Sequence, residues 1–335
     1  MTTPKPRAAT ITRAAAAFIA AVLLGACAAP GSGPTPATTA SARVPVPAGV
    51  QIGTPTPTSS SSAAPAPACD VYASGPRPPA TMPAPGAMPA GSTMAAILRR
   101  GHLNVGVDQN TYHFGYRDPA TGQIVGFDID IARAVAKAIF GDPSKINFVA
   151  ITSAQRIPYV QNNTVDLVAD TMTVTCQRLT QVQFSTIYYD AGQNLLVRKD
   201  STIKGTGDLA NKRVCAAAGS TSIQNIAALP THPVPVAVAD WTDCLVMLQQ
   251  GQVDAISTDD TILRGLAAQD PDTKLVGDNF TKEPYGLAMS LNKPDLVAFV
   301  NGVLQQLRTD GGWAAIYVKW LGGSAPTPPA AGYSN

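Results

Sequence analysis

The sequence predicts an α/β protein with two lobes, and three observations support this. Strand-like and helix-like segments alternate between residues 93 and 322, which is typical of a parallel or mostly parallel sheet covered by helices. The alternation starts again after about residue 190, and two extended segments, 188–197 and 279–290, connect the two sets of elements. Two lobes joined in this way form a hinge that can close on a small molecule. The alternative is one large domain with a long insertion.

The first lobe is predicted to comprise residues 93–190 and 285–323. The segment 127–140 has apolar residues at helical spacing and is followed by Gly141-Asp-Pro, so a helix should end there. Short apolar runs between polar residues predict buried strands. The predicted strands are 102–107, 145–151 and 165–169, and the other predicted helices are 153–161, 294–310 and 313–321.

The second lobe is predicted to comprise residues 191–284 and follows the same rules. Its predicted strands are 194–198, 212–217, 233–238, 253–257 and 274–276. Its predicted helices begin near 219–222, at 241 and at 261, and they end near 228, 250 and 269.

The N-terminal segment 1–26 is predicted to be a secretory signal peptide. Lys5, Arg7 and Arg13 precede an apolar run that is too short to span a bilayer. Small residues then lead to Cys27 in the lipobox pattern of bacterial lipoproteins. We therefore expect Cys27 to carry a lipid that anchors the protein on the extracytoplasmic face of the cell membrane. The alternative is an ordinary signal peptide followed by an incidental cysteine.

Loss of this signal peptide also changes the charge of the chain. Three positive charges leave with it, so the formal net charge changes from +2 to −1. A slightly acidic mature chain gives no reason to expect a nucleic-acid partner.

The segment 27–92 is predicted to be a disordered tether. It contains 15 of the 29 prolines, many serines and alanines, and few charges, so it cannot bury enough apolar surface to fold by itself. Cys69 lies near the edge of the folded body and could be joined to it. Residues 324–335 are predicted to be a disordered tail.

The cysteines predict two disulfides. Once Cys27 is set aside, four cysteines remain in an exported chain. Cys215 lies on a predicted strand and Cys244 on the next helix, which should pack over that strand, so we pair them. Cys69 and Cys176 then form the second bond by elimination. The spacing of cysteines and histidines predicts no metal site.

The first lobe contains a candidate site for an acidic group. Thr171, Thr173 and Thr175 alternate after a strand, and Arg178 follows where a helix should begin. Hydroxyls, free backbone amides and a guanidinium suit a carboxylate, although a capped helix with a solvated arginine is the alternative. Ser153 and Arg156 form a second such cluster. Two arginines near neighbouring strand ends indicate a ligand with two anionic or carbonyl ends.

The second lobe contributes Thr221 and Ser222 at a helix start, which favours another carboxylate contact or a plain helix cap. Asp259 and Asp260 follow a strand end, and we expect one to cap the next helix and the other to bind an ammonium group. Asp108 follows a first-lobe strand and should line the pocket.

Carboxylate partners on both lobes together with one ammonium partner describe an α-amino acid. Phosphate-binding loops, the nucleophile-elbow motif and a convincing catalytic triad are absent from the sequence, so it predicts no enzyme and no cofactor.

Several segments carry a resemblance to a known family. They are Gly126-Phe-Asp-Ile-Asp-Ile131, Thr152-Ser-Ala-Gln-Arg156, Thr171 to Arg178 with Phe184-Ser185, Gly219-Ser-Thr-Ser222, Val253-Asp-Ala255 with Asp259-Asp260, and Glu283-Pro-Tyr-Gly286. With these motifs the chain resembles the polar amino-acid solute-binding proteins of ABC importers, most closely the glutamine/glutamate-binding lipoproteins (GlnH type) of mycobacteria and related actinobacteria. The resemblance covers residues 97–321.

The resemblance implies the type II periplasmic-binding-protein fold, in a protein that we expect to be a monomer. It places Arg178 and Thr173 on the ligand's α-carboxylate, with Thr221 and Ser222 reaching it from the other lobe. It places Asp259 on the α-ammonium. The same resemblance assigns the ligand's side chain to Ser153 and Arg156.

The identity of the amino acid stays open at this stage. Asp108 stands where acidic-ligand members have a basic residue, so glutamate, glutamine, aspartate and asparagine all remain candidates. The partner would be an ABC permease. Two other functions are compatible with the same fold: sensing through a membrane receptor that feeds a kinase pathway, and an exported cyclohexadienyl or arogenate dehydratase in which Asp108 would be the acid.

Overall fold

The computed structural model describes residues 45–53, 68–73 and 75–334, and these residues belong to one compact unit. The predicted signal peptide and Cys27 lie outside the described residues. In the part of the chain that is described, none of the helices is long and apolar enough to cross a membrane.

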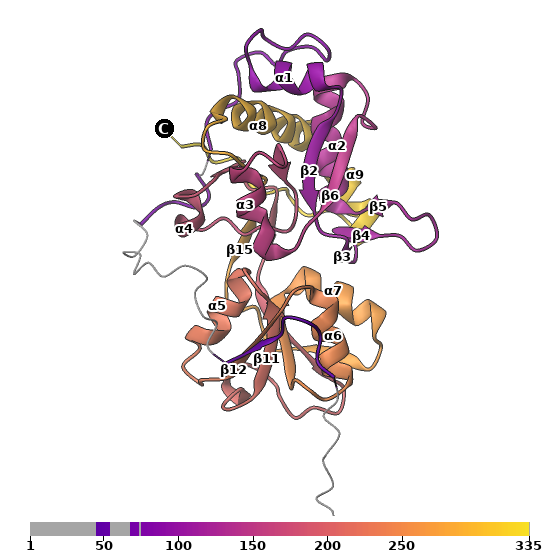
Figure 1. Cartoon of the computed structure of the whole chain (residues 1–335), viewed down its shortest axis with the longest axis vertical. Helices are drawn as coiled ribbons and strands as arrows, with labels where there is room; N and C mark the ends of the chain where they lie inside the picture. The colour runs from indigo at the N-terminus through magenta and orange to yellow at the C-terminus, as the bar shows by residue number, and fades with distance from the viewer. Residues whose placement is uncertain (1–44, 54–67, 74, 335) are drawn as a thin grey trace, which may run out of the picture. The chain divides into compact units, whose positions relative to one another are not determined.

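The first lobe is built on a five-stranded sheet with the strand order β6-β2-β7-β16-β8. Figure 1 shows β2 and β6 of this sheet side by side. β2, β6 and β7 are parallel, and β16 runs antiparallel to both of its neighbours. These strands are β2 (Leu103–Val107), β6 (Ile146–Ala150), β7 (Leu167–Val168), β8 (Gln183–Phe184) and β16 (Ala288–Met289), and a small sheet adds β3 (Asn110–Thr111), β4 (Gly115–Arg117) and β5 (Ile124–Val125).

Helices cover this sheet and share its core. Their bounds are α1 (Thr93–Arg100), α2 (Phe127–Phe140), α3 (Arg156–Gln161) after the 3-10 turn η1 (Ser153–Gln155), α4 (Cys176–Leu179), α8 (Pro294–Thr309) and α9 (Gly312–Leu321). The buried residues Phe127, Val105 and Phe299 belong to one apolar cluster that joins α2, β2 and α8. Burial of such side chains is the main force that holds this lobe together.

The second lobe is built on a six-stranded sheet with the strand order β1-β12-β11-β13-β10-β14. β12, β11 and β13 are parallel, while β1, β10 and β14 run antiparallel to their partners. The bounds are β10 (Gln193–Arg198), η2 (Thr206–Asp208), β11 (Arg213–Ala217), α5 (Thr221–Ala228), β12 (Val234–Val238), α6 (Trp241–Gln249), β13 (Ala255–Asp259), α7 (Asp260–Gln269) and β14 (Thr273–Val276).

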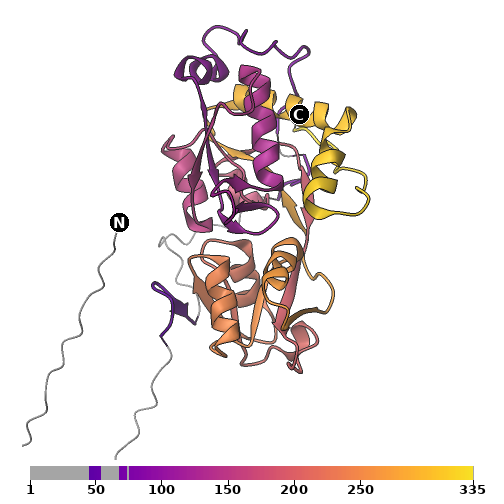
Figure 2. The ribbon, with the colours of Figure 1, turned by 90° about the vertical axis from the view of Figure 1, so that its right-hand side faces the viewer.

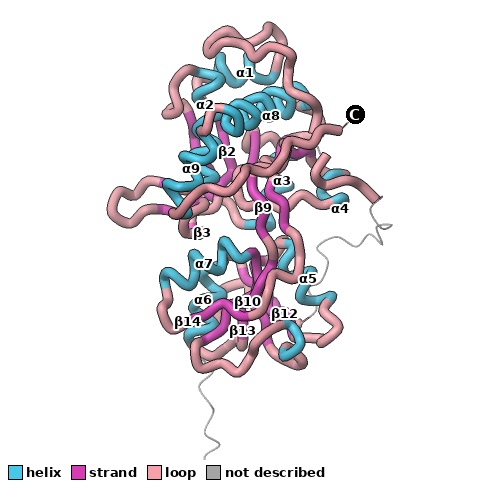
Figure 3. The backbone as a smooth tube through the Cα atoms, turned by 180° about the vertical axis from the view of Figure 1, so that it is seen from behind, coloured by secondary structure: helices cyan, strands magenta, loops and turns pink. Residues whose placement is uncertain are grey.

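Two antiparallel strands connect the lobes, as the sequence predicts. β9 (Tyr189–Ala191) pairs with β15 (Glu283–Tyr285), with Tyr189 opposite Tyr285 and Ala191 opposite Glu283. Figure 3 shows β9 between the two lobes. The predicted fold class, two α/β lobes joined by a double hinge, is therefore confirmed.

Both predicted disulfides are present. Cys215 is bonded to Cys244 in the second lobe, and Cys69 is bonded to Cys176 at the start of α4. The helix predicted at 127–140 has those same bounds, and it ends because Gly141 adopts a left-handed conformation with φ of 76°. The helix predicted at 153–161 divides into η1 and α3, with a capping box between Thr152 and Gln155 at its start.

The described parts of the Pro-rich segment, residues 45–53, 68–73 and 75–92, make contacts that the prediction of disorder does not include. Gln51 and Ile52 form β1, which pairs with the open edge of β12. Figure 2 shows this indigo segment at the side of the second lobe. Closer to the body, Gly86 donates its amide to the carbonyl of Ile139, 2.9 Å away. The physical reason is that an exposed strand edge and the ends of helices offer backbone partners that composition does not reveal.

The C-terminal tail also differs from its prediction. Tyr333 forms a bridge with Gly75, and Ser334 donates its amide to the Gly75 carbonyl. Arg308 donates from Nε to the carbonyl of Pro329 at 2.9 Å. These contacts place the tail against the first lobe and the segment that precedes it.

Candidate functional site

Arg178 lies at the boundary of the two lobes. Its short helix α4 is capped by the Thr175 hydroxyl, which accepts the Arg178 amide at 3.1 Å. Its guanidinium donates from Nη1 to the carbonyl of Thr173 (2.7 Å) and from Nη2 to the carbonyl of Gly219 on the second lobe (3.1 Å). Burial and the positive charge of Arg156 lower the pKa of Arg178 to about 9. A negatively charged group beside this guanidinium would relieve both effects.

Asp259 is the last residue of β13 and comes just before α7. Its Oδ2 accepts the hydroxyl of Tyr285 at 2.6 Å, whereas its buried Oδ1 has no hydrogen-bond partner in the described part of the chain. Burial and the nearby carboxylate of Glu283 raise the pKa of Asp259 to about 8. A buried acceptor without a donor is costly, so a cation placed here would be bound strongly.

The predicted helix cap by one of the two aspartates is not observed. The Asp259 side chain makes no capping hydrogen bond to α7. Asp260 instead accepts the amide of Gly192 at 3.4 Å and pairs with Arg264 at 3.2 Å. Asp259 is therefore available for a ligand, because its side chain is not used by the helix.

The charges on the two lobes interact with one another. Arg178 is stabilised by the negative charges of Glu283 and Asp259, and Asp259 is stabilised by the positive charge of Arg156. Arg156 and Arg178 belong to the first lobe, and Asp259 belongs to the second. The structure therefore brings the predicted carboxylate-binding and ammonium-binding residues into one buried electrostatic environment.

Arg156 is buried and held by backbone carbonyls. It donates from Nε to the carbonyl of Ser153 at 3.1 Å and from Nη1 to the carbonyl of Asp170 at 2.9 Å. Ser153 thus positions Arg156 through its backbone, and its hydroxyl makes no such contact. Two of the three guanidinium nitrogens of Arg156 therefore donate hydrogen bonds, and these bonds fix the direction of the third nitrogen, Nη2.

The threonine series is only partly extended. Thr171 has a φ of 39°, and its amide donates to Asp128 Oδ2 at 2.7 Å inside the first lobe. The sequence suggests that the side chains of Thr171 and Thr173 point in the same direction. Because this conformation interrupts the extended alternation, they do not simply do so. The Thr173 hydroxyl lies 3.5 Å from that of Thr221 on the second lobe.

The start of α5 has two roles. The Ser220 hydroxyl caps the helix by accepting the amide of Ile223, and the Thr221 hydroxyl donates to Glu283 at 2.9 Å. The Ser222 hydroxyl faces the interior of the second lobe and bonds the Thr258 hydroxyl at 3.1 Å. The first amides of a helix have no acceptor within it, so a ligand anion could be bound by backbone N–H groups at this helix start.

Asp108 is occupied by its own loop. Its carboxylate accepts the amides of Gln109 and Asn110 and the hydroxyl of Thr111, at 2.6, 2.8 and 2.5 Å. Burial raises the pKa of Asp108 above its ordinary value. These bonds give Asp108 a role in shaping the loop between β2 and β3.

Sequence reasoning missed two residues on the hinge strand β15. Glu283 accepts from Thr221, Asn225 and Thr281, and Tyr285 orients Asp259. A glutamate is an unusual residue in a buried strand, so its presence in the predicted extended segment 279–290 was the signal that could have identified Glu283.

A groove of about 510 Å³ opens at the contact between the lobes. Gly219 allows the backbone of the second lobe to lie close to Ala154 of the first lobe, because a Cβ at residue 219 would lie 2.7 Å from the Cα of Ala154. The φ of 79° at Gly219 also favours glycine. The lining residues include Gln51, Ser153, Ala154, Arg178, Gly219 and Ile223. Among the described residues, no cluster of metal-ligating side chains is found.

Comparisons with known proteins agree with this geometry. The chain is 40% identical over 230 residues to the ABC transporter glutamine-binding protein GlnH of Bacillus subtilis, covering 68% of this chain and 84% of the relative. It is 30% identical to the glutamate-binding protein GluB of Corynebacterium glutamicum, covering 72% and 86% of the two chains. A solved ancestral arginine-binding protein bound to glutamine is 34% identical with a TM-score of 0.63, covering 67% and 99%.

The family model for bacterial extracellular solute-binding proteins, family 3, matches residues 103–323, which include both lobes and the hinge. Because this match spans more than half of the chain and the structure has the corresponding two lobes, the protein belongs to the bacterial extracellular solute-binding proteins of family 3.

Proposed function

We propose that the protein binds a polar or acidic L-amino acid (glutamate, glutamine, aspartate or asparagine) between its lobes and delivers it to an ABC importer. The observation that carries this proposal is the pair formed by Arg178 on one lobe and Asp259 on the other. Both are buried, one is a guanidinium and the other a carboxyl group, and one Asp259 oxygen has no donor among the described residues. This pair matches the two charged groups that every free α-amino acid carries.

The binding mechanism follows from the division of the site between the lobes. Arg178 and the first amides of α5 would bind the α-carboxylate, and Asp259, oriented by Tyr285, would bind the α-ammonium. Neither half is complete without the other lobe. The ligand therefore favours the closed form by its higher affinity for that form, and the permease then recognises the closed arrangement.

The relatives support binding as opposed to catalysis. The proteins named above are a glutamine-binding protein, a glutamate-binding protein and an ancestral arginine-binding protein bound to glutamine. We further propose that the protein acts outside the cytoplasm and is held at the membrane by a lipid on Cys27. Mass spectrometry of the protein extracted from membranes would test the anchor, and an unmodified Cys27 would refute it.

Thermal unfolding in the presence of each of the twenty amino acids tests the binding function. A ligand present at a thousandfold excess over its dissociation constant should stabilise the protein by about 4 kcal/mol, so its melting temperature should rise by several degrees. We expect the four polar or acidic candidates to give the largest increases. If none of the twenty raises the melting temperature, the proposed function is wrong.

A further inference from the structure

Asp170 is a buried carboxylate that the proposed binding of the α-amino and α-carboxyl groups does not use. It lies two residues after the end of β7 and is 2% exposed. Its Oδ2 is buried and has no hydrogen-bond partner in the described part of the protein. Its backbone carbonyl accepts Nη1 of Arg156 at 2.9 Å. Asp170 therefore has an unpaired acceptor on its side chain, and its backbone bonds the arginine that is predicted to contact the ligand's side chain.

The charged groups around Asp170 come from four different elements. The positive charges of Arg156 and Arg178 stabilise its carboxylate, and the negative charges of Asp108 and Asp128 destabilise it. Asp108 is satisfied by its own loop. Asp128 is satisfied by the Thr171 amide and by the Tyr188 hydroxyl, at 2.7 Å each. Within this group of three first-lobe carboxylates, Asp170 is the one with an open acceptor.

Arg156 provides the matching donor. Its Nε and Nη1 bond the carbonyls of Ser153 and Asp170, which leaves Nη2 without a partner among the described residues. A carboxamide has an oxygen that accepts and a nitrogen that donates two hydrogen bonds, whereas an ionised carboxylate only accepts. Because Arg156 is bonded to the Asp170 carbonyl and its charge acts on the Asp170 carboxylate, an open donor and an open acceptor lie on neighbouring groups, which fits an amide. In its ionised form Asp170 disfavours an acid.

We propose that Asp170 determines the side-chain specificity of the cleft, with its Oδ2 and Arg156 together binding the carboxamide of glutamine or asparagine and excluding the carboxylate of glutamate or aspartate. The inference rests on the proposed function, because it concerns the same bound amino acid. It narrows four candidate ligands to two and assigns the discrimination to a residue outside the contacts with the α-amino and α-carboxyl groups.

Calorimetric titration of the purified protein with glutamine and with glutamate tests the inference. The wild type should bind glutamine more tightly. In Asp170→Asn, the ratio of the two dissociation constants should move toward glutamate by about tenfold or more, because the like-charge repulsion is gone. Asp200→Asn is the matched control, since it removes the same charge from a side chain that is 74% exposed, and it should leave the ratio unchanged.

The outcomes separate this inference from the proposed function. If the wild type binds neither amino acid nor any other of the twenty, the function itself fails. If the wild type binds amino acids but prefers glutamate, or if Asp170→Asn keeps the wild-type ratio, the role of Asp170 is refuted and amino-acid binding stands.

A measurement on the wild type covers the case in which Asp170→Asn does not fold. Burial raises the pKa of Asp170 well above its ordinary value. Its protonation at lower pH removes the repulsion and supplies a donor to a ligand carboxylate. The preference for glutamine over glutamate should therefore weaken as the pH is lowered and Asp170 becomes protonated. A preference that does not change as the solution is acidified would contradict the proposal.

Discussion

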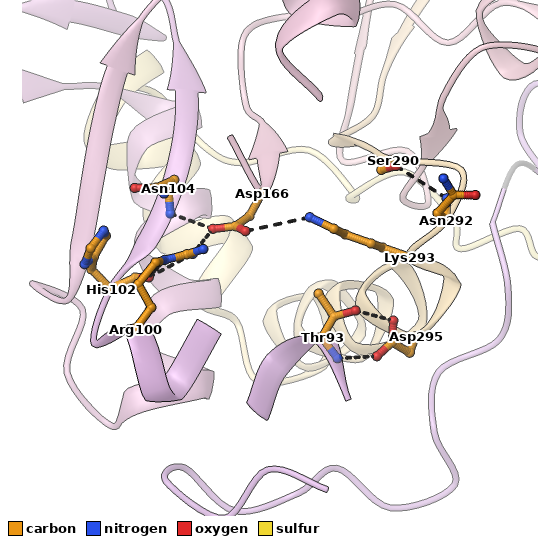
Figure 4. Close-up of polar contacts among 9 residues, drawn as sticks. All are labelled: Thr93, Arg100, His102, Asn104, Asp166, Ser290, Asn292, Lys293 and Asp295. Carbon is orange, nitrogen blue, oxygen red and sulfur yellow. Dashed lines mark hydrogen bonds and ion pairs between the residues drawn. The ribbon is translucent and has the colours of Figure 1, made fainter. Parts of the chain in front are cut away.

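The two ends of strand β7 carry one aspartate each, and their surroundings differ. Asp166 precedes the strand and is fully paired: Arg100 and the Asn104 amide bind its Oδ2, and Lys293 lies 3.9 Å from its Oδ1 (Figure 4). Asp170 follows the strand and keeps one buried oxygen without a partner among the described residues. The same residue type on one strand thus has two roles, and the position along the strand decides between them.

In the second lobe, an aspartate at the end of a strand resembles Asp170. Asp259 ends β13 and also keeps an unpaired buried oxygen. In α/β sheets, ligands bind beyond the carboxyl ends of the strands. At the opposite edge of the first sheet, acidic groups have hydrogen-bond partners within the protein: Asp295 at the start of α8 accepts both the amide and the hydroxyl of Thr93 at 2.7 Å (Figure 4). Of these four aspartates, the two beyond the carboxyl ends of β7 and β13 keep an unpaired buried oxygen, and the two at the opposite edge of the first sheet are fully paired.

The largest effect on binding is expected when the cleft loses Arg178, the proposed partner of the ligand's α-carboxylate. Arg178→Ala should weaken the binding of every amino acid by about 100-fold or more, because an ionised ligand group would be buried without its counter-charge. Calorimetry measures the loss. Arg198→Ala is the control, since that arginine pairs with Asp200 on the surface of the second lobe. Wild-type affinity in Arg178→Ala would show that the arginine belongs to the scaffold.

The sequence predicted the scaffold better than the site. Alternating apolar segments were enough to predict both sheets and the hinge, since periodicity depends on neighbouring residues alone. The pairing of Cys215 with Cys244 followed from a strand and the helix packed on it. By contrast, β1 joins a sheet edge far away in the sequence, and a proline-rich composition contains no information about such an edge.

The directions of the site side chains could not be predicted for a similar reason. Asp108 bonds its own loop, and Ser222 bonds Thr258, although each was predicted to reach the ligand. Hydrogen bonds of this kind depend on which donors the tertiary structure brings close. Arg178 and Asp259 stay predictions, and the argument for them was that a helix start and a strand end each restrict where a charged side chain can lie.

The next effect concerns the ammonium partner. Asp259→Asn should weaken amino-acid binding by about tenfold or more, because a hydrogen bond to a charged group is typically worth about 1.5–3 kcal/mol. In the absence of amino acid, the same variant should be as stable as the wild type or more stable, since the unpaired charge is removed. Calorimetry and urea unfolding measure the two effects. A variant that loses stability and keeps its affinity would assign Asp259 to the scaffold, like Asp166.

The stability effect at Asp259 has a definite pH dependence. Its pKa is raised to about 8 in the folded protein, against about 4 for an aspartate in an unfolded chain. The stability that this group contributes is therefore fully present below about pH 4 and is lost as the pH rises through about 8. The advantage of Asp259→Asn over the wild type should be larger at pH 8 than at pH 5. An equal difference at both pH values would contradict the raised pKa.

The smallest effect on binding is expected at the paired end of β7. Asp166→Asn leaves Arg100 and Lys293 without their counter-charge, and Arg100 is partly exposed, so the loss should be about 2 kcal/mol of unfolding free energy. Amino-acid affinity should stay at the wild-type value, because Asp166 lies at the edge of the sheet opposite to the cleft. Urea unfolding of Asp166→Asn, with Asp200→Asn as the exposed control, measures the stability, and calorimetry measures the affinity. A loss of affinity without a loss of stability would mean that pairing does not distinguish the scaffold from the site.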